Sequence, residues 1–137
     1  MKKLTVAVCL DDELGMMFNK RRQSRDRVLM ADMVKTANGN IYAQPYSERI
    51  LPEGSSYVLS ESPLQDAPSG AFCFIESLAL RPMLDDIERF IVYRWNRLYP
   101  ADVYFDVDLE KEGFRLVDEC EFEGSSHEKI TKGIYER

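Results

Sequence analysis

The sequence predicts a three-layer α/β domain with a mixed central sheet, flanking helices and antiparallel strands at the C-terminus. Two continuous apolar runs, residues 4–10 (LTVAVCL) and 71–75 (AFCFI), have the pattern of strands covered on both faces. Apolar residues recur at helical spacing over residues 24–37, and residues 114–122 and 130–135 resemble two antiparallel strands around a polar loop. No repeat or linker divides the 137 residues, so we expect a single domain spanning residues 1–137.

The expected helix over residues 24–37 has one apolar face and recognisable ends. Ser24 is a plausible N-cap, and Asn38-Gly39 is a plausible stop. Its apolar positions are Leu29, Met30, Met33, Val34 and Ala37.

The other elements are shorter. Residues 56–60 (SYVLS) read as a strand, and residues 61–70, with two prolines and no periodicity, as a loop. Residues 78–87 predict a short helix whose regularity Pro82 limits. Residues 90–95 and 103–109 are rich enough in β-branched and aromatic side chains to be strands.

Acidic residues alternate along the second of these stretches. Asp102, Asp106, Asp108 and Glu110 share parity, so on a regular strand they would lie on one face and could hold a hard cation. Surface charge is the alternative, since the intervening apolar residues supply a buried face.

Composition excludes several classes of protein. The chain has 18 Lys+Arg against 24 Asp+Glu, and a net charge of −6 argues against general affinity for nucleic acid or anionic membrane. One His cannot form a multi-histidine metal site, and the three Cys are too far apart for a zinc ribbon. We expect the cysteines to be buried, reduced thiols of a cytoplasmic protein. The apolar run at residues 4–10 is too short for a signal peptide, and no stretch approaches the ~18 apolar residues of a membrane helix.

A basic run interrupts this acidic chain. Its five cationic residues are Lys20, Arg21, Arg22, Arg25 and Arg27. At the start of a helix, these side chains and backbone N–H groups can converge on a phosphate or carboxylate. The alternative is a solvated loop paired with the acidic C-terminal third, where nine acids lie between Asp102 and Glu123.

The chain resembles the dihydrofolate reductase family through short motifs that keep their order over nearly its whole length. The C-terminal strands of that family read roughly D-x-x-F-P-x-I-D, then W-x-L-V, then a final Y-E-R. The matching residues are Asp102, Phe105, Asp108, Phe114, Leu116, Val117 and Tyr135-Glu136-Arg137. Upstream, residues 83–92 (MLDDIERFIV) are similar to L-L-P-x-A-D-x-L-Y-L, and residues 51–60 carry LPEG and YVLS, similar to L-P-G-R-x-N-I-V-L-S. The resemblance implies a dihydrofolate-reductase-like fold.

The segments with which that family binds NADPH phosphates are missing. The family uses a G-R-x-T segment and a G-G pair after a central strand, where glycine lets backbone N–H groups approach the anion. Here residues 75–77 (IES) stand at the glycine pair, and Glu76 adds negative charge. No G-R-x-T occurs between Gly39 and Arg49, and the chain is shorter between residues 60 and 71. We therefore predict no cofactor and expect no NADPH site.

On the folate side, the chain departs from the family at two positions and nearly preserves a third. Ser55 stands where the family has the Arg that grips a folate carboxylate, and Tyr93 where it has a Thr near the pterin. Asp26, eleven residues after Gly15, is close to the pterin-binding carboxylate, which would bind an amidine-like edge through two hydrogen bonds. The alternative is a solvent-exposed Asp26 that complements the helix dipole.

Residues 19–26 (NKRRQSRD) are also similar to a run in short bacterial sequences named ribonuclease Z, the tRNA 3′-processing endonuclease. The true enzyme holds two zinc ions with an H-x-H-x-D-H motif and further histidines, whereas this chain contains His127 alone. A zinc-dependent nuclease is therefore the wrong class. His127 could act as an acid or base with Ser126, but a lone His in a polar hairpin is usually exposed.

Together these observations predict a small-ligand or anion-binding module without reductase turnover. Its site would be the cleft between the first helix and the central strands, formed by Asp26, Arg21, Arg22, Arg25, Glu76 and Tyr93. One alternative is a reductase-type enzyme that uses Asp26 with an atypically bound cofactor. Another is an RNA-associated factor acting through residues 20–27, although no aromatic interleaving follows that run.

Overall fold

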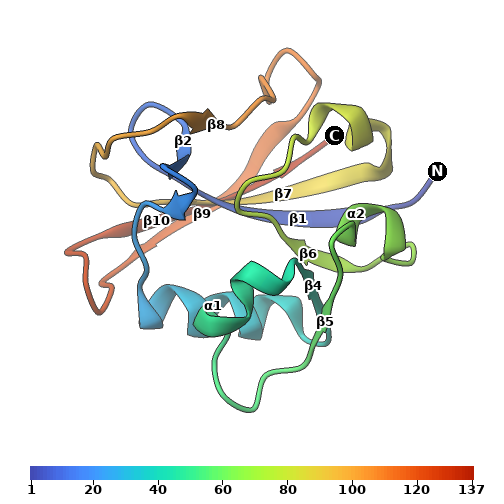
Figure 1. Cartoon of the computed structure of the whole chain (residues 1–137). Helices are drawn as coiled ribbons and strands as arrows, with labels where there is room; N and C mark the ends of the chain where they lie inside the picture. Colours follow the sequence, from blue (N-terminus) through green and yellow to red (C-terminus); the bar gives the residue numbers. More distant parts are fainter.

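The computed structural model describes all 137 residues and contains a seven-stranded sheet of order β5-β4-β6-β1-β7-β10-β9 (Figure 1). Strand β1 (Leu4–Leu10) pairs in parallel with both β6 (Phe72–Phe74) and β7 (Ile87–Arg94). The two apolar runs are therefore neighbouring central strands, as predicted. Strand β10 (Ile130–Glu136) runs antiparallel between β7 and β9 (Arg115–Phe122), which confirms the mixed sheet and its C-terminal hairpin.

Five further strands lie at one edge of the main sheet or in a separate small sheet. At one edge of the main sheet, β4 (Ile41–Ala43) pairs in parallel with β5 (Tyr57–Leu59); β5 was predicted and β4 was not. A separate three-stranded antiparallel sheet contains β3 (Arg21–Arg22), β2 (Gly15–Phe18) and β8 (Val103–Tyr104). This small sheet places the start of the basic run beside the carboxyl end of β1.

Helix α1 (Arg27–Ala37) begins later than the sequence suggested. Its N-cap is Asp26 and not Ser24, whereas its end at Asn38, with φ of 48°, is as predicted. The other helical elements are single turns or 3-10 helices. They are η1 (Pro45–Ile50), α2 (Pro63–Asp66) and η2 (Arg81–Asp86). The prediction of loop throughout residues 61–70 was wrong at α2, which starts at a proline because the first turn of a helix needs no N–H there.

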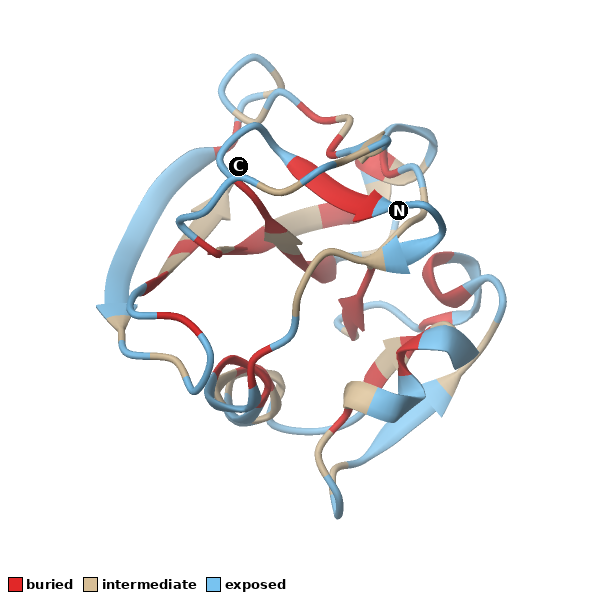
Figure 2. Cartoon of the chain, turned by 60° about the vertical axis from the view of Figure 1, so that its left-hand side comes forward, coloured by how far each residue is buried: buried red, intermediate tan, exposed pale blue.

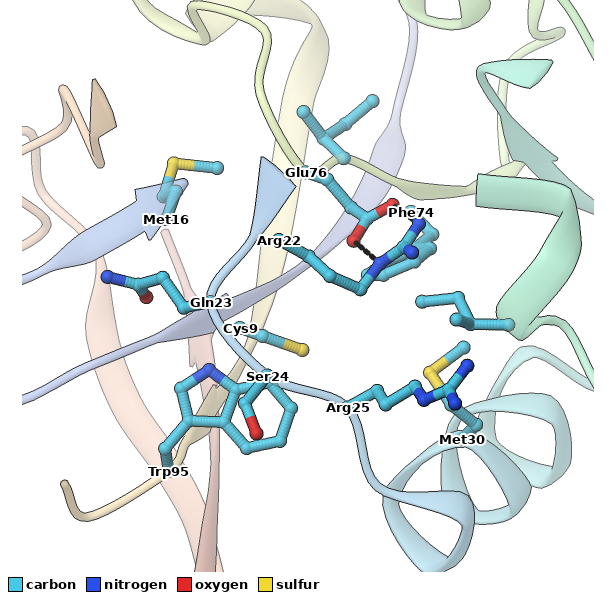
Figure 3. A pocket seen from close by; sticks show the side chains of 12 residues that line it. Cys9, Met16, Arg22, Gln23, Ser24, Arg25, Met30, Phe74, Glu76 and Trp95 are labelled. Atoms are coloured by element: carbon cyan, nitrogen blue, oxygen red, sulfur yellow. Dashed lines mark hydrogen bonds and ion pairs between the residues drawn. The ribbon is translucent and has the colours of Figure 1, made fainter. Parts of the chain in front are cut away.

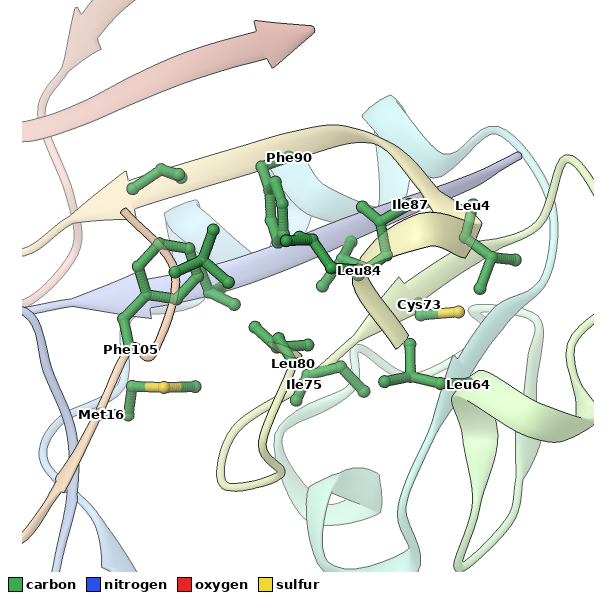
Figure 4. Close-up of a cluster of buried hydrophobic side chains, with 14 of the residues drawn as sticks. Leu4, Met16, Leu64, Cys73, Ile75, Leu80, Leu84, Ile87, Phe90 and Phe105 are labelled. Atoms are coloured by element: carbon green, nitrogen blue, oxygen red, sulfur yellow. The ribbon is translucent and has the colours of Figure 1, made fainter. Parts of the chain in front are cut away.

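The main sheet is covered on both faces, so the chain has three layers. On one face, Leu29 and Met33 of α1 pack against Phe74 and Ile91. On the other, Phe90 meets the ring of Phe105 edge-on at 5.5 Å, within a larger cluster shown in Figure 4. Figure 2 shows that the edge strand β9 remains exposed along almost its whole length.

The stretch after β8 departs from the predicted strand over residues 103–109. Only Val103–Tyr104 pair in a sheet, because the Asp106 carboxylate turns inward and accepts hydrogen bonds from the backbone N–H groups of Leu80 (3.0 Å) and Arg81 (3.2 Å). The acidic residues therefore do not share one strand face. No group of three potential metal ligands gathers anywhere in the chain.

The three cysteines are free, as predicted, but they differ in burial. Cys73 is buried, Cys9 is half-buried and Cys120 is exposed on β9, so the prediction of burial was wrong for Cys120. Burial raises the pKa of the Cys73 thiol to about 12. None of the helices is both long and apolar enough to cross a membrane.

Candidate functional site

A narrow cavity lies between the carboxyl ends of β1 and β6, residues 22–25 and the first half of α1 (Figure 3). Its floor is apolar, with side chains from Cys9, Phe74, Met30 and Trp95. Its volume is about 20 Å³. That is roughly room for one water molecule, so a larger ligand enters only if a side chain moves.

The ion pair between Arg22 and Glu76 closes one side of this cavity (Figure 3). Arg22 Nε donates to Oε1 at 2.9 Å and Nη2 donates to Oε2 at 3.1 Å, while the Ser47 hydroxyl donates to Oε2 at 2.7 Å. The side chains are only 18% and 9% exposed. Although burial opposes it, the bonds to Glu76 hold the pKa of Arg22 above its ordinary value. Arg22 also lies over the Tyr46 ring at 4.3 Å and donates to the Tyr46 carbonyl.

A wider groove of about 830 Å³ shares part of its lining with the cavity. Residues 21–25 and η1 form most of its wall, including Arg21, Arg22, Ser24, Arg25, Tyr46, Glu48 and Arg49. No salt bridge of the chain involves Arg21, Arg25 or Arg49. The alternative of a basic run paired with the acidic C-terminal third is therefore not what the structure shows. An adjoining hollow of about 460 Å³ adds Arg27 to the same side of the molecule.

Asp26 lines the adjoining hollow, not the groove itself, and is fully engaged by the chain. It is 2% exposed, so the alternative of a solvent-exposed carboxylate was wrong. Oδ1 accepts hydrogen bonds from the N–H groups of Val28, Leu29 and Ser125, and Oδ2 accepts one from Ser126 N–H at 2.7 Å. Burial alone would raise the pKa of Asp26, but these donors and His127 hold it well below its usual range. Its oxygens are not free for an amidine-like ligand.

His127 is buried beside Asp26, contrary to the expected exposed hairpin residue. Its Nδ1 lies 3.0 Å from Asp26 Oδ2, and its Nε2 lies 3.1 Å from Ser24 Oγ and 2.9 Å from the Tyr99 hydroxyl. The imidazole stacks on Trp95 with ring centroids 4.6 Å apart. Four side chains from distant parts of the sequence therefore fix the orientation of this ring.

Tyr93 lies under α1, away from the lining of the cavity and the groove. Its hydroxyl donates to Asp32 Oδ2 at 2.7 Å, and Lys132 Nζ pairs with the same carboxylate at 2.9 Å. Burial and the Asp32 carboxylate raise the pKa of Tyr93 far above its usual range. The structure thus gathers Arg21, Arg22, Arg25 and Glu76 in one place, with Asp26 at its border and Tyr93 outside it.

A second buried carboxylate anchors the segment that carries the arginines. Asp11 accepts hydrogen bonds from the N–H groups of Gly15 (2.7 Å) and Glu13 (2.9 Å) and from Gln23 Nε2 (2.8 Å). A Cβ at Gly15 would lie 2.6 Å from Asp11 Oδ2, so this close approach requires glycine. Gln23 Oε1 is buried without a hydrogen-bond partner.

Sequence reasoning missed several residues of this region. Ser24 was assigned only to the helix start, and Arg49 and Tyr99 were not considered. The contact between Ser24 and His127 joins residues 103 positions apart, so no local pattern reveals it. The small, polar residues around His127 were the one available signal, because such side chains let a loop fold closely over a helix start.

No protein-family model matches the chain, and no curated protein matches it either. Among solved structures, the dihydrofolate reductase from Enterococcus faecalis, complexed with NADP(H) and RAB-propyl, superposes with a TM-score of 0.70. The match covers 98% of this chain and 96% of that one, at 10% sequence identity. The chain has a dihydrofolate-reductase-like fold. At 10% sequence identity, this structural similarity shows the fold and says nothing about function.

The end of β6 in this dihydrofolate-reductase-like chain does not fit NADP(H). A dinucleotide phosphate needs backbone N–H groups that it can approach closely. Residues 75–77 all carry side chains, and the Glu76 carboxylate lies there, held by Arg22 and Ser47. An anion at this strand end would meet a carboxylate and would have to break a largely buried ion pair.

Proposed function

We propose that this protein binds a small anionic ligand in the arginine-lined groove and does not turn over as a nicotinamide-dependent reductase. The observation that carries the proposal is the gathering of Arg21, Arg25 and Arg49, none of which has a carboxylate partner, on one groove of a chain whose net charge is −6. Arginines that lie in one groove and have no carboxylate partner favour the binding of an anion, because the planar guanidinium group binds a carboxylate or phosphate through two hydrogen bonds.

The groove suits a small molecule. Its volume of about 830 Å³ lies within the range of roughly 300–1,000 Å³ that is typical of small-ligand sites. Glu48 is the one carboxylate in its lining, and its side chain accepts a hydrogen bond from the Tyr57 hydroxyl at 2.8 Å. Because Arg22 is already neutralised by Glu76, the free positive charge comes from the other three arginines.

Thermal shift and calorimetry with pyrophosphate and citrate test this proposal. Saturating anion should stabilise the protein, since a ligand at 100 times its Kd adds about 2.7 kcal/mol. An Arg21→Ala/Arg49→Ala double variant should bind about tenfold more weakly or worse. Arg115→Ala removes an exposed arginine outside the groove and serves as the matched control. An equal loss of anion affinity in the double variant and in Arg115→Ala would refute the proposal. So would the absence of stabilisation by either anion.

Two further ligands separate the alternatives in the same assay. Stabilisation by NADPH would favour an enzyme with an atypically bound cofactor. Tighter, salt-sensitive binding of a single-stranded RNA oligonucleotide than of pyrophosphate would favour an RNA-associated factor, because backbone phosphate contacts release counterions. Either result would replace the small-anion ligand proposed here.

A further inference from the structure

We propose that Ser24, His127 and Asp26 form a nucleophilic centre that hydrolyses carboxylic esters of an anionic molecule held in the arginine groove. The anionic part of this substrate rests on the proposed function. The nucleophilic centre itself rests on different atoms: Ser24 Oγ is 3.1 Å from His127 Nε2, and His127 Nδ1 is 3.0 Å from Asp26 Oδ2. Nucleophile, base and orienting carboxylate therefore stand in the order and at the distances that acyl transfer by serine requires.

Asp26 sets the proton position on the imidazole. A carboxylate only accepts hydrogen bonds, so the proton of a neutral His127 lies on Nδ1 and leaves the Nε2 lone pair facing Ser24. Backbone N–H donors hold the pKa of Asp26 below its usual range, so this carboxylate stays ionised. Trp95 stacks on the face of the imidazole and so fixes the plane of the ring. Asp26 and Trp95 are thus positioning residues, and Ser24 and His127 are the reacting groups.

Tyr99 competes for the same nitrogen. Its hydroxyl lies 2.9 Å from Nε2, slightly closer than Ser24 Oγ. One lone pair cannot accept two strong hydrogen bonds at once, so the Tyr99 bond reduces the activation of Ser24 in the free protein. Removing the Tyr99 hydroxyl should therefore leave the serine at least as reactive as before.

Ser24 is reachable from the groove. It lines both the narrow cavity and the arginine groove, together with Arg22 and Arg25. The backbone N–H groups of Ser24 and Arg25 donate to no acceptor within the chain. These donors, and the unpaired guanidinium of Arg25, are available to a negative charge that develops on a carbonyl oxygen bonded to Ser24.

The reaction balances with water as its only co-reactant. Ser24 Oγ bonds to the ester carbonyl carbon while its proton passes to His127 Nε2. The carbon–oxygen bond to the leaving alcohol then breaks, and the proton on Nε2 passes to that alcohol. Water repeats both steps on the acyl-serine, which releases a carboxylic acid and restores Ser24.

Labelling with a fluorophosphonate probe tests the nucleophile. Mass spectrometry of the full chain should show one adduct, mapped to Ser24, and none in Ser24→Ala. His127→Gln should slow labelling by about 100-fold or more. Tyr99→Phe should label at least as fast as the native chain, and Ser56→Ala, an exposed serine far from any histidine contact, should be unchanged. A chain that forms no adduct, or whose Ser24→Ala variant still labels, would show that the three residues only tie the loop to the helix.

Comparing the hydrolysis of two esters with acyl groups of similar length tests the anionic substrate separately from the nucleophilic centre. Mono-4-nitrophenyl succinate carries a carboxylate, and 4-nitrophenyl butyrate does not. We expect the kcat/KM for the succinate to exceed that for the butyrate by about tenfold, and Arg21→Ala/Arg49→Ala to bring the ratio near one. An adduct on Ser24 with no preference for the succinate would refute the anionic substrate. Pyrophosphate binding without an adduct would refute the nucleophilic centre and leave the anion site standing.

Discussion

Replacing Asp26 with Asn keeps the shape of the side chain and removes the acceptor that joins the start of α1 to residues 125–127. In the native chain Oδ2 accepts from Ser126 N–H at 2.7 Å and faces His127 Nδ1 at 3.0 Å, while Oδ1 accepts from three backbone N–H groups. An amide nitrogen accepts no hydrogen bond, so Asn with its oxygen at the Oδ1 position strands the buried Ser126 N–H, while His127 can adapt by moving its proton from Nδ1 to Nε2. One stranded donor costs about 1–3 kcal/mol, which predicts a loss of that size in the free energy of unfolding.

The same variant should change how stability depends on pH. Because the folded pKa of Asp26 is lowered, the unfolded chain takes up its proton first as the pH falls. The contribution of this carboxylate is therefore fully present above the ordinary Asp pKa of about 4 and is lost as the pH drops toward the folded value. The difference in stability between the native chain and Asp26→Asn should shrink on acidification below about pH 4.

Urea unfolding followed by the fluorescence of Trp95, the single tryptophan, measures both effects because this ring stacks on His127 beside the mutated site. Asp85→Asn, at an exposed carboxylate with no hydrogen bond, is the control. A loss below about 1 kcal/mol at neutral pH would be smaller than one stranded donor requires. A stability difference that stays constant down to acid pH would show that the pKa of Asp26 is not lowered in the folded protein.

Two further substitutions probe neighbouring contacts by the same unfolding assay. A Cβ at Gly124 would lie 2.8 Å from Asp26 Cγ, so Gly124→Ala should destabilise the chain by about 1–3 kcal/mol, and unchanged stability would show that the loop has room to move. Tyr93→Phe removes a donor to Asp32, which keeps Lys132; we expect a loss of about 1 kcal/mol and unchanged pyrophosphate affinity. Weaker pyrophosphate binding by that variant would place Tyr93 in the ligand site after all.

The central strands were predictable because their burial on both faces leaves a local trace. Residues 4–10 and 71–75 are apolar without alternation, which at this length is the pattern of a strand inside a sheet. Strand β4 left no such trace, since Ile41–Ala43 are three residues whose pairing comes from neighbours on both sides. The start of α1 was ambiguous because Ser24 and Asp26 are both good N-caps. Donors from residues about 100 positions away in the sequence settle it in favour of Asp26.

The candidate site was likewise predictable only in part. The basic run was visible as charge, and Glu76 as a departure from the resembling family. Their pairing was not visible, because Arg22 and Glu76 are 54 residues apart and meet only through the order of the strands. His127 was expected to be exposed from its polar neighbours. Those neighbours are instead the donors that bury it against Asp26.

The segment that carries the arginines is held at both of its ends, and this bears on how it binds. Arg22 is fixed by Glu76 and by the Tyr46 hydroxyl, which accepts its backbone N–H at 3.0 Å. At the other end, Asp26 is held by six hydrogen-bond contacts to the helix start and to residues 125–127. The backbone between them, which carries Arg25, need not be ordered when an anion arrives, so in this segment only the exposed Arg25 side chain loses freedom on binding. The fixed ion pair and the fixed carboxylate thus make the free arginines beside them a preorganised site.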